Sequence, residues 1–175
     1  NRQKIKDSLE NNLNNLFPLK RSILGSDTLK TLNYIKEIIG GDIRSLKSGE
    51  NVFDWEIPFE WTLNEAYIEN EFGEIIVSDS DNHLHVLNYS ENIDIIVNPS
   101  NYKNHLFYNK DLPEAIPYRT SYYSDNWGFC LTKKQYDNVL ANSKVRFKID
   151  SVKKKGILNY LECFIPGKNK EEILI

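Results

Sequence analysis

Residues Ile116–Leu131, with the sequence IPYRTSYYSDNWGFCL, form the most distinctive stretch of this chain. Five of its sixteen residues are aromatic, namely Tyr118, Tyr122, Tyr123, Trp127 and Phe129. Aromatic side chains bury a large apolar area, and Tyr and Trp also carry a polar tip that needs a hydrogen-bond partner. A stretch of this kind either forms the middle of a domain or lines a pocket, and it follows a stiff segment with two prolines, Asp111–Pro117.

Composition places the whole chain among ordinary globular proteins. It has 175 residues, of which 40% are apolar and 27% charged, enough for one domain or for one domain with a nested insertion. The net charge of −3 and the pI near 5.7 give no basic footprint for nucleic acid. The sequence has neither an apolar run of about 18 residues nor a signal-peptide pattern. We therefore expect a cytoplasmic protein with no nucleic-acid or membrane partner.

The two cysteines are too few for a disulfide framework. Cys130 lies in the aromatic stretch and Cys163 in an expected strand. Their neighbours predict two buried free thiols, which fits a cytoplasmic location.

Helical periodicity dominates the start of the chain. Residues Ile5, Leu9, Leu13 and Leu16 predict an amphipathic helix over Arg2–Leu16. A second helix is expected to begin at a cap formed by Ser26 or Asp27 and to end at Gly40–Gly41. A short strand is expected to follow at Asp42–Leu46.

From residue 51 the helical pattern gives way to β-favouring segments. Alternation predicts the strands Phe53–Pro58, His83–Tyr89 and Asn92–Val97. Glu74–Val77 and Lys144–Ile149 are also expected as strands, Trp61–Ile68 as a strand or an irregular edge, Asn101–Phe107 as a helical turn and Thr132–Leu140 as a helix. Two further strands are expected at Gly156–Ile165 and Glu172–Ile175. We infer three parts, residues 1–50, a β-rich domain of residues 51–150 nested within the first, and a return at residues 151–175.

Several blocks then resemble a known family. They are VFDWEIPFEW (52–61), AYI (66–68), HLHVLNYS (83–90), AIPYRTSYYSDNWGFCL (115–131), IDS (149–151), IPG (165–167) and EILI (172–175). In this order they resemble the zinc aminopeptidase-like proteins of bacterial polysaccharide-biosynthesis clusters. The resemblance implies an α/β fold, with zinc-exopeptidase-like α/β flanks around a nested, mainly-β domain of unknown function.

The resemblance also implies zinc as the cofactor of the full-length protein. In the family the metal motif follows the position of Glu172–Ile175, so no metal ligand and no catalytic residue is assigned to this chain, and we expect more protein to have followed. One residue departs from the family pattern. Arg119 stands where an apolar residue is expected, so it either alters substrate choice or points to solvent.

The aromatic stretch supplies the candidate substrate-binding residues. Tyr122, Tyr123 and Trp127 could line a groove, with Arg119 offering its charge to a carboxylate or phosphate. The alternative is that they form the core or an interface, and in a strand the two tyrosines would point to opposite faces.

Histidines and carboxylates give weaker signals. His83 and His85 would share a strand face, but no third ligand stands at a diagnostic spacing, so we expect His85 to be buried or to line the pocket. His105 is expected at the surface. Asp54 and Glu56 would also share a strand face, where solvent exposure is commoner than acid–base catalysis.

Three functions remain open. The first is the N-terminal portion of a zinc-dependent aminopeptidase-like amide hydrolase, whose nested domain shapes the substrate cleft or an oligomer interface and whose substrate is a small peptide or an amide-bearing sugar. The second is a non-catalytic module that binds a sugar or peptide. The third is an interaction role in a homo-oligomer. We favour the first on the strength of the resemblance.

Overall fold

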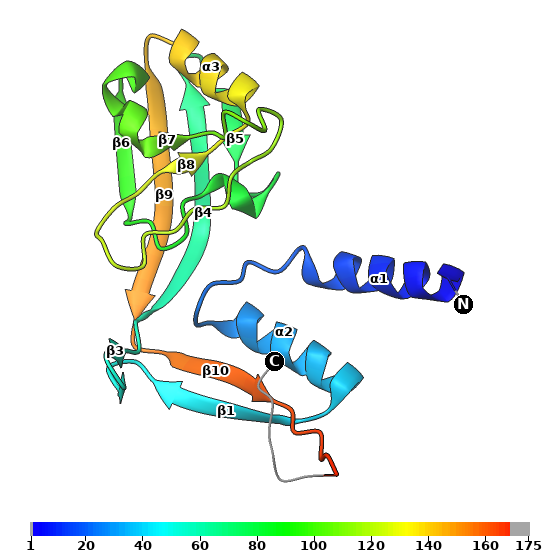
Figure 1. The fold of residues 1–175 in the computed structure, drawn as a ribbon. Coiled ribbons are helices and arrows are strands. Elements are labelled where there is room, and N and C mark those ends of the chain that lie inside the picture. The colour runs from blue at the N-terminus through cyan, green and yellow to red at the C-terminus, as the bar shows by residue number, and fades with distance from the viewer. Residues whose placement is uncertain (1, 169–175) are drawn as a thin grey trace. The chain divides into compact units, whose positions relative to one another are not determined.

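The computed structural model describes residues 2–168, so the expected strand Glu172–Ile175 lies outside the described residues. The chain divides into two compact units (Figure 1). Unit 1 comprises residues 1–57 and 156–175, and unit 2 runs without interruption from Pro58 to Lys155. From the sequence, the nested domain was expected to span residues 51–150. Residues 51–57 instead belong to unit 1, where they form a hairpin. The last strand of unit 2 continues to Lys154.

Unit 1 begins with two helices, α1 (Arg2–Leu16) and α2 (Ser26–Ile39), and α1 has the limits that its apolar periodicity predicts. The Tyr34 hydroxyl of α2 donates a hydrogen bond to the Asn12 side chain of α1 over 2.8 Å. The expected cap of α2 is wrong, because Gly25 occupies the N-cap position. The carboxylate of Asp27 instead accepts a hydrogen bond from the backbone N–H of Lys20.

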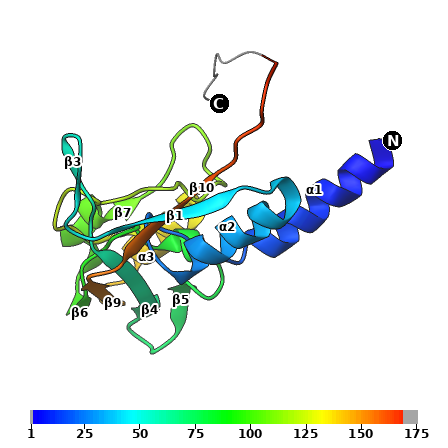
Figure 2. The same cartoon turned by 90° about the horizontal axis from the view of Figure 1, so that it is seen from below.

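Strands β1 (Asp42–Lys47) and β10 (Ile157–Glu162) complete unit 1 as an antiparallel ribbon, and α2 packs along it (Figure 2). Gly41 precedes β1 with a φ of +102°, and a side chain there would collide with the backbone of Glu162. The expected strand Phe53–Pro58 is wrong. Its residues contribute to a tight hairpin between β2 (Asn51–Val52) and β3 (Trp55–Glu56).

Unit 2 is built on an antiparallel sheet with the order β5-β4-β9-β6. The strands are β4 (Glu60–Asn70), β5 (Ile75–Ser78), β6 (Ile93–Val97) and β9 (Val145–Lys154). The expected segment Trp61–Ile68 is therefore a central strand, paired with β9 along nearly its whole length. Helix α3 (Lys133–Ala141) starts at a capping box formed by Thr132 and Gln135.

The chain between these strands is less regular than the sequence predicts. His83–Tyr89 is not a strand, since a short 3-10 helix covers His83–His85 and an extended segment follows. A second such helix covers Pro99–His105. The aromatic stretch contributes only β8 (Phe129–Cys130), which pairs in parallel with β7 (Leu106–Phe107).

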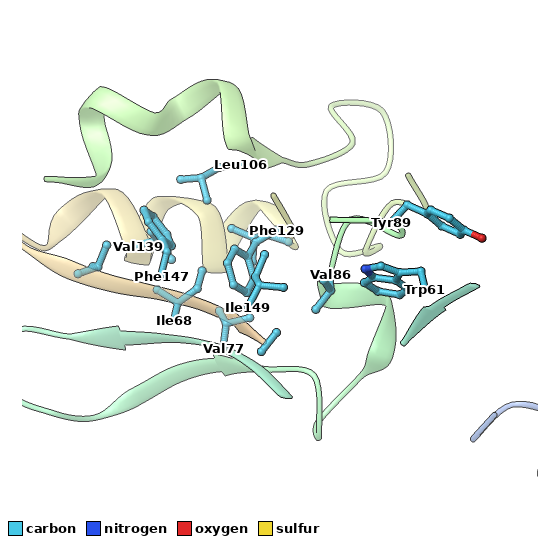
Figure 3. Packing of buried hydrophobic residues seen from close by; sticks show 13 residues of the cluster. Trp61, Ile68, Val77, Val86, Tyr89, Leu106, Phe129, Val139, Phe147 and Ile149 are labelled. Atoms are coloured by element: carbon cyan, nitrogen blue, oxygen red, sulfur yellow. The ribbon is translucent and has the colours of Figure 1, made fainter. Parts of the chain in front are cut away.

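The core of unit 2 lies on one face of the sheet. Ile68, Phe147 and Ile149 alternate inward along β4 and β9 and are fully buried. Leu106, Phe129 and Val139, from outside the sheet, pack onto them (Figure 3), and Leu131 belongs to the same cluster. On the opposite face, Arg146 binds Asp94 through two 2.7 Å hydrogen bonds, which lower the pKa of the Asp94 carboxyl. Among residues 2–168, no helix is long and apolar enough to cross a membrane.

Candidate functional site

The aromatic stretch is an irregular loop that is held in a fixed conformation by backbone hydrogen bonds. Asn88 donates to the carbonyl oxygen of Arg119 over 3.0 Å and accepts from the N–H of Ser121 over 2.9 Å. Two further bonds of 2.9 Å, from Leu87 to Gly128 and from Glu91 to Asn126, continue the attachment. The loop is thus pinned along residues 87–91 and can present its side chains as a rigid surface.

Trp61 and Tyr89 form the base of this surface. Their rings stack with centroids 5.9 Å apart, at one end of the unit 2 core (Figure 3). Tyr89 has a φ of +67°, which is unfavourable for a residue with a Cβ. Its hydroxyl donates to the carbonyl oxygen of Phe59 over 2.7 Å, and the stacking and this bond offset the backbone strain.

Three further tyrosines build outward from Tyr89. Tyr122 packs edge-on against Tyr89 with centroids 4.7 Å apart, and Tyr123 packs edge-on against Tyr122 at 6.5 Å. The hydroxyls of Tyr118 and Tyr122 are hydrogen-bonded at 2.9 Å. We call Tyr89, Tyr118, Tyr122 and Tyr123 the tyrosine platform.

The platform offers ring faces and neutral hydroxyls to a ligand. Tyr123 is 83% exposed and Tyr118 60%, whereas Tyr122 is half-buried. Burial, followed by the hydrogen bond with Tyr118, raises the pKa of Tyr122 above its usual value, so this phenol stays protonated. Because one hydroxyl of the Tyr118–Tyr122 pair donates to the other, the second keeps its own proton to donate elsewhere. Such a surface suits sugar or peptide groups and has no charge of its own.

His85 does not join the platform, because both of its ring nitrogens are engaged inside unit 2. Its side chain is buried, and Nδ1 donates to the carbonyl oxygen of Cys130 over 2.8 Å. Nε2 therefore accepts from the side-chain amide of Gln135 at 3.3 Å. The amide oxygen of Gln135 is bonded to Thr132, which fixes the orientation of the amide. His85 is therefore a structural group that links Cys130 to Gln135.

Trp127 and Arg119 also contact residues outside the tyrosine platform. Trp127 stacks on His105 with centroids 4.0 Å apart, and His105 Nδ1 donates to the Trp127 carbonyl oxygen over 2.8 Å. The expected surface position of His105 is therefore wrong, since it is half-buried in this stack. Arg119 is exposed, with its guanidinium 4.9 Å from the centre of the Phe107 ring. Of the five sequence candidates, only Tyr122 and Tyr123 meet in one surface.

The two cysteines lie in different environments. Cys130 is buried, and burial raises the pKa of its thiol to about 12. Cys163 is exposed, so the expectation of two buried thiols is wrong for this residue. The strand expected around it ends at Glu162, one residue earlier.

The acidic residues described here do not assemble a metal site. Asp54 lies in the turn of the β2–β3 hairpin, so it does not share a strand face with Glu56. The buried carboxylate of Asp79 accepts a hydrogen bond from the backbone N–H of Ala66 over 2.8 Å. Within residues 2–168, no group of three or more His, Cys, Asp or Glu side chains could hold a metal ion. The residues present do not fit the zinc that the sequence resemblance implies for the full-length protein.

Comparison with known proteins identifies the family. Residues 60–152, nearly all of unit 2, match the domain of unknown function DUF2172. The chain belongs to this family. It is 39% identical over 165 residues to a Clostridium acetobutylicum protein provisionally named a polysaccharide biosynthesis protein with aminopeptidase-like domain. The resemblance to aminopeptidase-like proteins of polysaccharide biosynthesis is thereby confirmed.

A solved structure extends the similarity to three dimensions. It comes from Clostridium acetobutylicum, is provisionally identified as a peptidase, and matches with a TM-score of 0.81 and 36% identity over 89% of this chain. The sequence match covers 94% of this chain but 38% of the curated relative, and the structural match covers 37% of the solved structure. The chain thus spans just over a third of the length of both.

The site residues that sequence reasoning missed are Tyr89 and Tyr118. Both lie in blocks that carry the family resemblance, but nothing in their spacing shows that they meet Tyr122. A signal for Tyr118 could have come from its residue type, because tyrosines in binding loops often contact ligands. Tyr89 is buried, so its residue type gives no such signal.

Proposed function

We propose that this chain is the N-terminal part of a zinc-dependent, aminopeptidase-like amide hydrolase. The observation that carries the proposal is the relation to the Clostridium protein, which matches nearly all of this chain but continues well beyond it. The name of that relative mentions an aminopeptidase-like domain, and the similar crystal structure is named as that of a peptidase. The hydrolytic centre would lie in the portion of such proteins outside the match.

The surface of α1 supports this proposal. Ile5, Leu9, Leu13 and Phe17 lie on or directly after α1 and are each more than half exposed. An apolar stripe along a helix is normally buried against another element. The β1–β10 ribbon has two strands, and such ribbons gain stability from further neighbours. Unit 1 therefore has surfaces that additional polypeptide would cover.

Under this proposal, zinc is bound by residues outside positions 2–168, and it would supply the hydrolytic chemistry there. Unit 2 would contribute substrate recognition. The tyrosine platform is the part of unit 2 that suits this role, with a small peptide or an amide-bearing sugar as the ligand. Its ring faces favour stacking, and because the platform carries no charge, it does not favour an anionic ligand.

A chimera tests the proposal. In it, this chain replaces the matching segment of the Clostridium relative, and the intact relative serves as the positive control. Aminoacyl anilides and N-acylated amino sugars are offered as substrates. We expect the chimera to hydrolyse the amide substrate that the intact relative hydrolyses. A folded chimera that leaves this substrate intact would contradict the proposal.

A second function, recognition of a sugar without hydrolysis, is favoured by the platform itself. Tyr118 and Tyr123 are exposed on a loop whose backbone is pinned, so little conformational entropy is lost when a ligand stacks on them. This function requires neither zinc nor the remaining polypeptide. Binding of saccharides by the chain alone would therefore separate it from the first proposal.

A further inference from the structure

The β2–β3 hairpin of unit 1 is short and firmly held. Val52 pairs with Trp55 at its end, and Asn51 pairs with Glu56. The pairing continues below these strands, where the N–H of Ile57 donates to the Glu50 carbonyl oxygen and the N–H of Gly49 donates to the Ile57 carbonyl oxygen, each over 2.9 Å. Ile57 is buried at this root. The two turn residues are therefore carried on a rigid support.

Phe53, the first turn residue, is unfavourable in two respects. Its φ is +56°, whereas φ at Asp54 is not positive. This pattern fits a two-residue turn whose first position is normally occupied by Gly. Its side chain is 100% exposed. A large aromatic residue thus replaces the favoured Gly without gaining any burial against the described residues 2–168, and strain of this kind is typical of functional positions.

The charge of the hairpin indicates what could receive Phe53. Residues 50–56 contain three carboxylates, Glu50, Asp54 and Glu56, and no basic residue. A surface that accommodates the hairpin needs an apolar socket for the ring and basic groups around it. An anionic membrane surface does not meet the second requirement, since it would repel the three carboxylates.

We propose that Phe53 is an anchor that inserts into an apolar socket with a basic rim on the remaining portion of the longer aminopeptidase-like protein. This inference rests on the proposed function. The hairpin belongs to unit 1, whose α1 stripe is also exposed, and the relative continues beyond its matched segment. One covering polypeptide accounts for both exposed features.

The test measures binding of this chain to a separately produced polypeptide, the portion of the Clostridium relative outside the match. The variants are Phe53→Gly and a control, Phe72→Gly. Phe72 is 79% exposed in the β4–β5 turn of unit 2, so the control removes another largely exposed aromatic ring. A third variant, Asp54→Lys, reverses one charge of the hairpin.

We expect the Phe53→Gly change to have opposite effects on stability and on binding. The unfolding midpoint of the isolated chain should stay unchanged or rise by a few degrees, because Gly relieves the strain. The affinity should fall by about tenfold or more, as expected for a central aromatic anchor. The Phe72→Gly variant should bind like the original chain. The Asp54→Lys variant should bind more weakly, with the loss reduced at high salt.

Two results overturn the inference on its own. In the first, the original chain binds and the Phe53→Gly variant binds equally well. In the second, the Phe53→Gly variant unfolds at a clearly lower temperature, which would show that the ring has a structural role. A failure of the original chain to bind would instead count against the proposed function, and this inference would fall with it.

Discussion

The indole Nε1 of Trp61 donates a 2.9 Å hydrogen bond to the carbonyl oxygen of Ser90. The hydroxyl of Ser151 donates to the same oxygen over 2.8 Å. Since Trp61 lies in β4 and Ser151 in β9, this single carbonyl joins the two central strands to the segment that carries Tyr89. The base of the tyrosine platform is therefore tied to the sheet by two buried donors.

Removing these donors together should cost more than the sum of the single losses. In Trp61→Phe or Ser151→Ala, the Ser90 carbonyl keeps one partner, so the lost bond itself contributes about 1 kcal/mol in each case, beside the packing changes. In the double variant the buried oxygen loses both donors, which adds a desolvation cost of about 1–3 kcal/mol. Urea unfolding of all four proteins measures the coupling. Strict additivity would show that the shared carbonyl is unimportant.

Gly128 should not tolerate a methyl group. A Cβ at this position would lie 2.6 Å from Phe107 Cε2 and 2.7 Å from the carbonyl oxygen of His105. The Gly128→Ala variant should lose about 1–3 kcal/mol of unfolding free energy through overpacking.

Gly73→Ala is the matched control. Its φ of +82° is unsuited to Ala, whereas Gly128 has no positive φ, and no atom lies within 4 Å of the added Cβ at Gly73. Its cost should be limited to the backbone strain, about 1 kcal/mol. The prediction concerns the larger loss at Gly128. Equal losses at the two positions would contradict the close packing of β7 and β8 around Gly128.

The two thiols should react at very different rates with a disulfide reagent at neutral pH. Cys163 is exposed, whereas Cys130 is buried with its thiol pKa raised to about 12. Because only the thiolate reacts, native protein should show one fast thiol and a second only after unfolding. Replacing Cys163 by Ser should remove the fast phase. Two fast thiols in the native protein would show that Cys130 is accessible.

The tyrosine platform should bind saccharides weakly through Tyr123. The Tyr123→Ala variant should lose about 1 kcal/mol of binding free energy or more, since its ring is the most exposed stacking face of the four. Titration with N-acetylated amino sugars, followed by NMR of the sugar protons, measures this loss. Phe72→Ala is the control, because it removes an exposed aromatic residue outside the platform.

The same titration separates the sugar from the oligomer proposal. If Tyr123 mediates contact between copies, Tyr123→Ala should change the molar mass in light scattering and leave sugar binding unaffected. Equal sugar binding by the Tyr123→Ala and Phe72→Ala variants would reject the platform as a saccharide site.

Local patterns predicted the elements whose stability is set locally. The helix Arg2–Leu16 follows from its apolar spacing, and the expected strand Lys144–Ile149 lies within β9, whose residues alternate in burial. Alternation failed for His83–Tyr89. There the Asn82 side chain accepts a hydrogen bond from the N–H of Leu84 and starts a 3-10 turn. Alternation also failed for Phe53–Pro58, because Phe53 lies in a turn that no Gly or Asn marks in the sequence.

Only the part of the candidate site that depends on local sequence was predictable. Tyr122 and Tyr123 stand out by residue type within the aromatic stretch. The contribution of Tyr89 depends on its contact with Tyr122 and on the hydrogen bond to Phe59, which lies 30 residues earlier. Sequence spacing does not show contacts over such distances. The same limit explains why His85 and Trp127 were considered ligand-binding residues although their partners lie within unit 2.

The central claim is that this chain is one part of a zinc-dependent aminopeptidase-like protein, and metal content tests it most directly. Elemental analysis would compare the chain alone with the chimera in which it replaces the matching segment of the Clostridium relative. The account predicts zinc in the chimera, at one or two ions per molecule as in the co-catalytic zinc aminopeptidases, and none in the chain alone. A folded chimera without zinc would contradict the claim, and so would stoichiometric zinc in the chain alone.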